Sequence, residues 1–246
     1  MSQHTISSVA HLIAEPVRAV MLITLSDGGA LPAGALADAA GVTPQTASSH
    51  LAKLLTGGLV TVETKGRHRY YRLAGPHVAL ALESLASVGP VTPAWRSPPT
   101  RAAKELRFAR CCYDHLAGQI GVAVTRGMLA RGFLVEAGER DYGVTPSGID
   151  WLRSLGLDVD ELQLDEPGLV RQCLDWTERQ RHVAGPFGAR LLNAFFAWDW
   201  MRRVPGRRSV LITPLGWAAL KQHFGIEREG RPAQPNIGEP MASSRL

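Results

Sequence analysis

Cysteine, aspartate and histidine occur together at two places in the C-terminal half of this chain. The first place reads RCCYDHLAGQIG over residues 110–121, and the second reads CLDWTERQRHVAGPFG over residues 173–188. Both contain Cys-x-Asp, and both continue to His-x-Ala-Gly-x-x-Gly, with extra residues between Asp and His in the second copy. Because these residue types ligate metals, carry thiol redox chemistry and act as nucleophiles, each of these chemistries has to be considered.

Metal binding uses the residues that recur in both copies, which are Cys112, His115, Cys173 and His182. Two cysteines and two histidines can surround zinc tetrahedrally if the two copies face each other. A softer, thiophilic ion would favour the thiolates. We expect Cys112 and His115 to lie on one face of a helix. The pattern therefore suggests zinc or another thiophilic ion as the cofactor, without identifying it.

Other roles remain open for the same stretch. Cys111 or Cys112 can pair with Cys173 on oxidation, which would make a redox sensor. A small apolar effector can bind between the copies, against the aromatic residues of 193–201 together with Trp176 and Trp217. Alternatively, these aromatic residues and the cysteines are core, with each Asp capping a helix and each His hydrogen-bonded inside.

Catalysis by a Cys–His–Asp set is a more remote alternative. The sequence contains no phosphate-binding loop, no Gly-x-Ser-x-Gly and no His-Glu-x-x-His motif. The candidate residues also lie in a pattern that occurs twice in the chain. We therefore predict that the protein is not an enzyme.

The similarity between the copies extends to their ends. Thr-Pro-x-Gly precedes an apolar segment in both, and Thr145 and Thr213 are predicted helix N-caps followed by Pro at the first helical position. The last glycine of the shared motif precedes this threonine by 24 residues in one copy and by 25 in the other. We predict an internal duplication in which each copy has the winged-helix-like order helix, helix, strand or hairpin, helix.

The N-terminal third has the element order of a winged helix-turn-helix. Apolar residues at helical spacing follow Ala14, a short helix ends at Gly41, and Thr43 caps a second helix that begins with Pro44. The stretches LVTVET and RHRYYRL predict a β-hairpin, and GPHVALALESLASV predicts a closing helix. The second helix of such a pair can enter the major groove of DNA, while the hairpin contacts phosphates.

The predicted DNA-contacting residues are small or polar on the recognition helix and mostly basic on the hairpin. They are Thr43, Gln45, Thr46, Ser48, Ser49, His50 and Lys53 on the helix, and Lys65, Arg67, His68, Arg69 and Arg72 on the hairpin. The net charge of +5 permits an anionic partner. Because several of the basic residues cluster on the hairpin, double-stranded DNA is the partner that we predict.

This segment resembles the DNA-binding segment of the ArsR family of bacterial transcriptional regulators. The resemblance rests on SHLAKL at 49–54, GLV at 58–60 and RHRYYRL at 67–73, and it covers about residues 6–88. It implies a homodimer that binds operator DNA and usually represses transcription, with dimer contacts from the first and last helices of the unit.

Two metal sites known in ArsR proteins are not carried over. The Cys-x-Cys pair of some members is missing, because the recognition helix begins GVTPQTASSH. Other members bind zinc on the closing helix through paired Asp and His, whereas this helix offers only His77 and Glu83. A sensing function is therefore expected in the C-terminal repeats.

The predicted fold is mainly α with small β-hairpins (α+β). The predicted domains are a winged helix-turn-helix at 1–88, a Pro-rich linker at 89–104, repeats at 105–164 and 165–227, and a disordered tail at 228–246. Three cysteines do not form a disulfide framework, and neither a signal peptide nor a membrane-spanning apolar stretch is present. The sequence predicts a cytoplasmic repressor without a membrane partner, released from its operator by an effector that the repeats sense.

Overall fold

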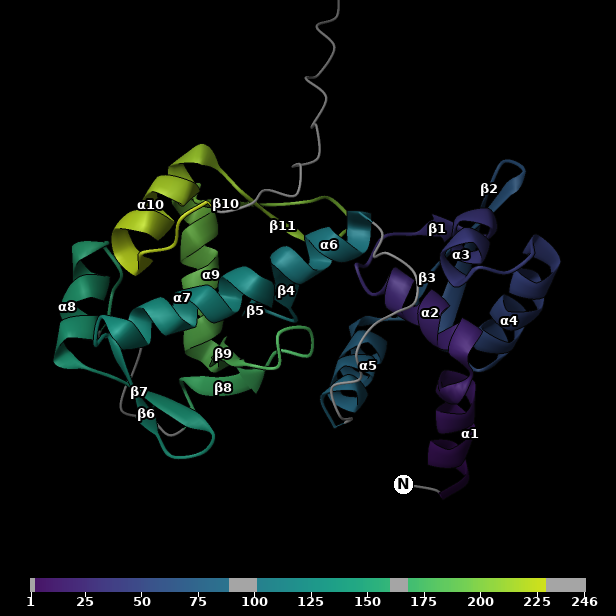
Figure 1. The fold of residues 1–246 in the computed structure, drawn as a ribbon, viewed down its shortest axis with the longest axis horizontal. Coiled ribbons are helices and arrows are strands. Elements are labelled where there is room, and N and C mark those ends of the chain that lie inside the picture. The colour runs from purple at the N-terminus through teal and green to yellow at the C-terminus, as the bar shows by residue number, and fades with distance from the viewer. Residues whose placement is uncertain (1–2, 89–100, 160–167, 229–246) are drawn as a thin grey trace, which may run out of the picture.

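Two units lie side by side in the computed structural model, which describes residues 3–88, 101–159 and 168–228. We call residues 3–88 the N-terminal unit and the remaining described residues the C-terminal unit. Figure 1 shows the N-terminal unit on the right and the C-terminal unit on the left. Each unit has its own cluster of buried apolar side chains.

Helices make up most of the N-terminal unit. Local signals in the sequence define their ends: Thr43 Oγ1 accepts a hydrogen bond from the backbone N–H of Thr46, and Gly41 ends the preceding helix with φ +65°. The helices are α1 (Gln3–Ala14), α2 (Pro16–Leu25), α3 (Ala33–Ala40), α4 (Pro44–Thr56) and α5 (Pro76–Val88).

A small antiparallel sheet completes the N-terminal unit. Its strands are β1 (Leu31–Pro32), β2 (Val60–Lys65) and β3 (His68–Leu73), in the order β1-β3-β2. The predicted hairpin is present, with Lys65 opposite His68. The winged helix-turn-helix predicted from the order of elements, and implied by the ArsR resemblance, is thereby confirmed as a fold. Strand β1 and the separate helix α1 were not predicted.

The C-terminal unit begins with α6 (Arg101–Phe108) and then repeats one order of elements twice. The order is hairpin, helix, hairpin, helix. The first copy contains β4 (Arg110–Cys112), β5 (His115–Ala117), α7 (Gly118–Ala130), β6 (Leu134–Ala137), β7 (Asp141–Val144) and α8 (Pro146–Ser154). The second contains β8 (Arg171–Leu174), β9 (Arg181–Ala184), α9 (Gly185–Ala197), β10 (Met201–Arg203), β11 (Val210–Ile212) and α10 (Pro214–Phe224).

The predicted first helix of each copy is therefore wrong, because a hairpin stands in its place. Gly118 opens α7 with φ +82°, and a Cβ atom there would lie 2.5 Å from the carbonyl oxygen of Arg107. A helix cannot continue backward through such a position. The hairpin also finds backbone partners far along the chain, since the Cys111 N–H donates to the carbonyl of Arg208. The predicted N-caps Thr145 and Thr213 are both confirmed.

The two copies interlock around one core. Strand β5 packs against α9, strand β9 packs against α7, and β7 pairs with β8 to join the sheet β6-β7-β8-β9. The core includes Met128 and Leu152 of the first copy together with Phe187 and Phe195 of the second. A common origin by duplication stays a prediction.

Some predicted boundaries need comment. Helix α6 begins at Arg101, so the last four residues of the predicted linker are helical, and the helix packs onto the C-terminal unit farther along, through Leu106 and Phe108. Residues 89–100 of the linker, 160–167 of the repeats and 229–246 of the tail lie outside the described residues.

Across the described ranges, no single helix is both long and apolar enough to span a bilayer. The helical segments Ile6–Ala14 and Pro16–Leu25 meet that criterion only when joined, and they are bent by 92° relative to each other. Met21, Leu22 and Leu25 on the second segment are completely buried in the core of the N-terminal unit.

Candidate functional site

Four predicted ligands converge where the two copies meet. Cys112, His115, Cys173 and His182 each place one ligand atom within 4.8 Å of the other three. In a tetrahedral zinc site with two sulfurs and two nitrogens, these atoms would be about 3.3–3.8 Å apart. A contraction of the cluster by an ångström or so at its widest therefore reaches tetrahedral geometry.

The two hairpins position these residues as cross-strand pairs. Cys112 lies opposite His115 on β4 and β5, and Cys173 lies opposite His182 on β8 and β9. Directly opposed residues of an antiparallel pair have their Cβ atoms about 4.5–5.5 Å apart. The expectation that Cys112 and His115 share a helical face is thus wrong, and the cross-strand register brings each pair together instead.

The two imidazole rings face each other across the cluster. The Nε2 atoms of His115 and His182 are 3.1 Å apart. The other nitrogen of His115, Nδ1, is hydrogen-bonded to Asp114 Oδ1 at 2.9 Å, whereas Nδ1 of His182 lies 3.9 Å from Asp175 Oδ2 and has no hydrogen-bond partner among the described residues. A carboxylate behind a histidine orients the ring and raises its basicity as a metal ligand.

The cluster is largely closed to solvent. Cys112, His115 and His182 are buried, and Cys173 is half-buried. Contact with the thiol of Cys173, together with burial, raises the pKa of Cys112 to about 12. The same contact lowers the pKa of Cys173. Burial lowers the pKa of His115, but its contacts with Cys112 and Asp114 outweigh that effect and raise it. The cysteine and histidine side chains of the cluster therefore carry protons that a bound cation would displace.

Asp175 lies behind the cluster and is held by contacts with both copies. Its carboxylate lies 3.0 Å from the Arg110 guanidinium, and neither side chain is exposed. It also accepts hydrogen bonds from the N–H of Gly118 at 2.7 Å and from the hydroxyl of Thr177. Burial raises the pKa of Asp175, but Arg110 and these hydrogen bonds lower it well below its usual range. Asp175 thus caps α7 of the other copy, whereas Asp114 contacts His115.

Glu83 is a neighbour of the cluster that sequence reasoning did not place there. It comes from α5 of the N-terminal unit and is 8% exposed. Its Oε2 lies 3.5 Å from Cys112 Sγ, which donates to it, and its Oε1 accepts from Arg208 at 2.7 Å. A glutamate on the helix face shared by Val78, Ala79 and Leu82 was the available sequence signal, since a charge on an apolar face needs a partner.

The three predicted redox cysteines are separated into a pair and a single residue. All three are free thiols, and the sulfurs of Cys112 and Cys173 lie within 4.8 Å of each other. Cys111 belongs to the core of the C-terminal unit, and its sulfur lies 3.8 Å from a guanidinium nitrogen of Arg203. Successive residues of a strand point to opposite faces, which is why Cys111 is not part of the cluster.

Two cavities lie between the N-terminal and C-terminal units. One of about 170 Å³ is lined by apolar residues of α2 and α5 and by Trp176. The other, of about 350 Å³, is lined by residues that include Leu80, Cys111, Tyr113 and Arg208. Neither lies between the two copies, where an apolar effector was predicted. The aromatic residues near 193–201 pack with the core instead, as Phe195 and Trp200 do with ring centroids 5.1 Å apart.

The predicted DNA-contacting residues are exposed on α4 and on the β2–β3 hairpin, with one exception. His50 is only 17% exposed, and its Nδ1 lies 3.1 Å from the carboxylate of Glu15 at the start of α2. It therefore faces the interior side of α4. The exposed residues are Thr43, Gln45, Thr46, Ser48, Ser49, Lys53, Lys65, Arg67, His68, Arg69 and Arg72.

Comparison with known proteins gives similarities over both units. A family model described as a helix-turn-helix domain matches residues 13–63. The uncharacterized HTH-type transcriptional regulator YdfF of Bacillus subtilis (strain 168) is 38% identical over 222 residues, covering 90% of this chain and 98% of that protein.

Solved structures match a smaller part of the chain. The homodimeric winged helix-turn-helix DNA-binding domain of Mb0332 from Mycobacterium bovis, a possible ArsR-family regulator, is 34% identical, with a TM-score of 0.32. The match covers 35% of this chain and 77% of that one. The cadmium metal-sensor CMTR from Mycobacterium tuberculosis is 31% identical with a TM-score of 0.29, covering 38% of this chain and 96% of that one.

Proposed function

We propose that this chain, which belongs to the family of HTH-type transcriptional regulators, is a repressor controlled by a thiophilic metal ion. The observation that carries the proposal is the convergence of Cys112, His115, Cys173 and His182 within 4.8 Å of one another. Zinc is the ion that best fits two thiolates and two imidazoles in a tetrahedron. The ion is the effector, and the proposal assigns no catalytic role to the cluster.

Operator binding uses the exposed polar face of α4 and the basic β2–β3 hairpin. Gln45 and Thr46 at the start of α4 are exposed and can reach base edges. Lys65, Arg67 and Arg69 extend from the hairpin and contact phosphates. Because this contact is with operator DNA, the protein acts in the cytoplasm.

A homodimer explains the apolar side chains left exposed on α1 and α5. Ile6, Leu80, Leu85 and Val88 are all more than half exposed, and Val88 reaches 85%. Contiguous exposed apolar side chains on a soluble protein mark interaction surfaces. Pairing of these helices in two chains covers them and presents two recognition helices to one operator.

Metal analysis combined with DNA binding tests this function. The protein is stripped with a chelator, reloaded with Zn²⁺ and examined by elemental analysis, and its affinity for DNA is measured by fluorescence anisotropy. The DNA is a duplex that the metal-free protein selects from a random-sequence pool. We expect about one zinc per chain and at least about a tenfold loss of DNA affinity on loading.

Variants identify the ligands in the same experiment. Cys112→Ser and His182→Ala should abolish stoichiometric zinc retention, because each removes one of four ligands. Cys111→Ser is the matched control, since Cys111 lies outside the cluster. A parent protein that retains no zinc, or whose DNA affinity no added metal ion changes, contradicts the proposal.

A second candidate function is a thiol switch. It rests on the proximity of Cys112 and Cys173, whose sulfurs lie within 4.8 Å of each other. Peroxide takes two electrons and two protons from the two thiols, which yields one disulfide and two molecules of water. Mass spectrometry of the metal-free protein without reductant tests it: a Cys112–Cys173 disulfide that lowers DNA affinity supports the switch, and its absence excludes it.

A further inference from the structure

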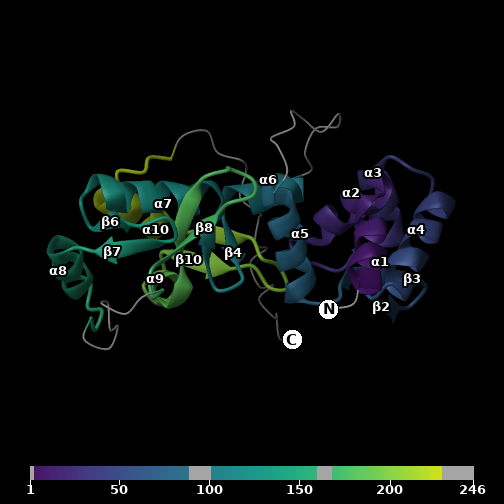
Figure 2. The ribbon, with the colours of Figure 1, turned by 90° about the horizontal axis from the view of Figure 1, so that it is seen from below.

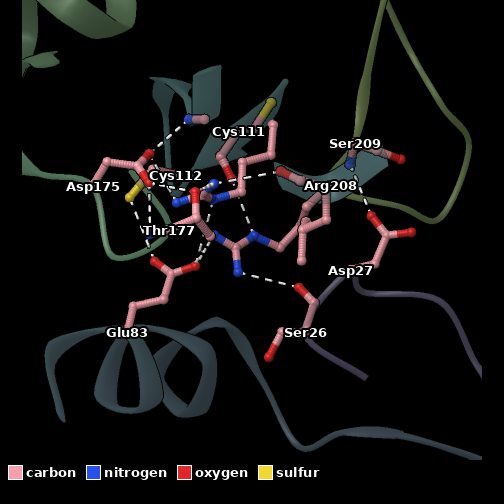
Figure 3. Close-up of polar contacts among 12 residues, drawn as sticks. Ser26, Asp27, Glu83, Cys111, Cys112, Asp175, Thr177, Arg208 and Ser209 are labelled. Carbon is pink, nitrogen blue, oxygen red and sulfur yellow. Dashed lines mark hydrogen bonds and ion pairs between the residues drawn. The ribbon is translucent and has the colours of Figure 1, made fainter. Parts of the chain in front are cut away.

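The geometry points to Glu83 and Arg208 as the relay between the four-ligand cluster and the N-terminal unit, so that metal occupancy changes how α5 and the end of α2 are held. This inference rests on the proposed function and specifies its regulation. Figure 2 shows α5 between the C-terminal unit and the other helices of the N-terminal unit, and Figure 3 shows Glu83 directed from α5 toward Cys112 and Arg208.

Arg208 joins three separate elements. Its Nη2 donates to Glu83 Oε1 on α5 at 2.7 Å, its Nε donates to the carbonyl of Cys111 on β4 at 3.1 Å, and its Nη1 donates to the carbonyl of Ser26, directly after α2, at 3.2 Å. The neighbouring Ser209 N–H also donates to the carboxylate of Asp27 at 3.0 Å. The loop between β10 and β11 thereby connects the β4–β5 hairpin to α5 and to the end of α2.

Glu83 is the contact between this loop and the ligands. One carboxylate oxygen accepts from Arg208, and the other accepts from the thiol of Cys112 at 3.5 Å. Arg110, whose Nε lies 3.9 Å from Glu83, belongs to the same hairpin as Cys112. Because Glu83 is almost fully buried, its carboxylate charge is stabilised by these partners instead of by water.

Metal ligation changes the contact at Cys112. The sulfur binds the ion as a thiolate, so its proton passes to solvent and can no longer be donated to Glu83. Contraction of the cluster to tetrahedral distances also draws Cys112 Sγ toward the ion. Glu83 then faces a sulfur without a proton, and its remaining partners are Arg208 and Arg110.

The consequence for DNA binding follows from where these contacts end. Helix α5 carries the exposed Leu80, Leu85 and Val88, and α2 packs against α3 and α4. A shift of α5 or of the α2 end relative to β4 therefore alters both the proposed dimer surface and the support of the recognition helix. Two ligands couple when each favours a different arrangement of the same contacts.

Glu83→Gln tests the relay with the Zn²⁺ and DNA measurements described above. The amide keeps the size of the side chain but removes its charge. We expect zinc affinity, measured by competition with a chromophoric chelator, within about threefold of the parent. The effect of zinc on DNA affinity should fall from at least about tenfold to under about twofold.

Two further variants complete the test. Arg208→Lys keeps a positive charge but loses the simultaneous contacts to Glu83, Cys111 and Ser26, and it should reduce the zinc effect in the same direction even if Glu83→Gln fails to fold. Arg179→Gln is the matched control, because it alters contacts to the carbonyls of Ala86 and Ser87 near the end of α5 and leaves the four candidate ligands, Glu83 and Arg208 unchanged.

The outcomes separate the relay from the function on which it rests. A parent whose DNA affinity responds to zinc, with a Glu83→Gln variant that responds equally, overturns the relay alone. A parent that binds no zinc overturns the proposed function and the relay with it. If Arg179→Gln loses the effect of zinc on DNA affinity to the same extent, any change at the contact between α5 and the C-terminal unit has this result, and the relay is overturned.

Discussion

The two hairpins that carry the candidate ligands have the same Cys-x-Asp beginning, yet their aspartates do different work. Asp175 of the second copy is completely buried, pairs with Arg110 and caps α7. Asp114 of the first copy is 48% exposed and contacts His115. The second copy therefore supplies the buried ion pair that joins the two copies, whereas the first copy contacts Glu83 of the N-terminal unit through Cys112.

Removal of this ion pair should have the largest effect. Asp175→Ala leaves the buried Arg110 without the nearer of its two carboxylate partners and removes the cap of α7, so we expect a loss of about 3–5 kcal/mol in the free energy of unfolding. Urea denaturation followed by circular dichroism measures it. Asp114→Ala is the matched control and should cost less than about 1 kcal/mol. Equal losses in both variants would remove the distinction between the copies.

The glycines that open the two long helices should show that the copies are alike in backbone. Gly118 and Gly185 have φ values of +82° and +75°, and an added Cβ would lie 2.5 Å and 2.7 Å from a carbonyl oxygen. Alanine at either position should cost about 2–3 kcal/mol, from the left-handed conformation and the clash together.

Gly132 is the control for these glycines. Its φ is +68°, but no atom lies within 4 Å of an added Cβ, so alanine there should cost only about 1–2 kcal/mol. Thermal and urea unfolding of the three variants gives the comparison. A Gly118→Ala variant as stable as Gly132→Ala would mean that the close approach to Arg107 is not a constraint.

The aspartates should also differ in their effect on zinc. Asp114→Ala removes the carboxylate 2.9 Å from His115 Nδ1, and loss of such a partner typically weakens metal binding by about 10- to 100-fold. Chelator competition measures this change, with Asp141→Ala as a control away from the cluster. An unchanged zinc affinity would show that Asp114 does not orient the ligand.

Acid should reveal the smallest difference. The pKa of Asp175 is lowered in the folded protein, so its stabilising contribution is complete above its unfolded value near about 4 and is lost as the pH falls. The loss begins as the pH approaches about 4 and reaches about 1 kcal/mol by pH 3. Unfolding of the parent and of Asp175→Asn over this range should give curves that converge at low pH. Parallel curves would contradict the pKa shift.

The N-terminal unit was predictable from local signals. Thr43 and Gly41 act as caps, apolar spacing marks the helices, and the hairpin alternates as a strand pair should. The recurring Thr145 and Thr213 were predicted as caps for the same reason. Among the predicted DNA-contacting residues, only His50 is not exposed, because its ring contacts Glu15 at the start of α2.

The candidate site was predictable only in part. Repetition within the chain singled out the four candidate ligands, because residue types that recur at matching places stand out without a structure. It did not indicate strands, and neither did residues 110–117 themselves. Besides pairing with each other as β4 and β5, these residues have backbone partners at Arg208 and Ser209, about a hundred residues later, and local propensity carries no information about such distant hydrogen bonds.

The sequence by itself determined the winged helix-turn-helix, the capped helices of the repeats and the identity of Cys112, His115, Cys173 and His182. These features depend on residue type and short spacing, and physical preferences act on them locally. Only the tertiary structure decided that the ligands meet as cross-strand pairs, that Cys111 faces away, and that Glu83 reaches the cluster from another unit. Each of these depends on long-range packing, in which buried charges must find partners wherever the folded chain brings them.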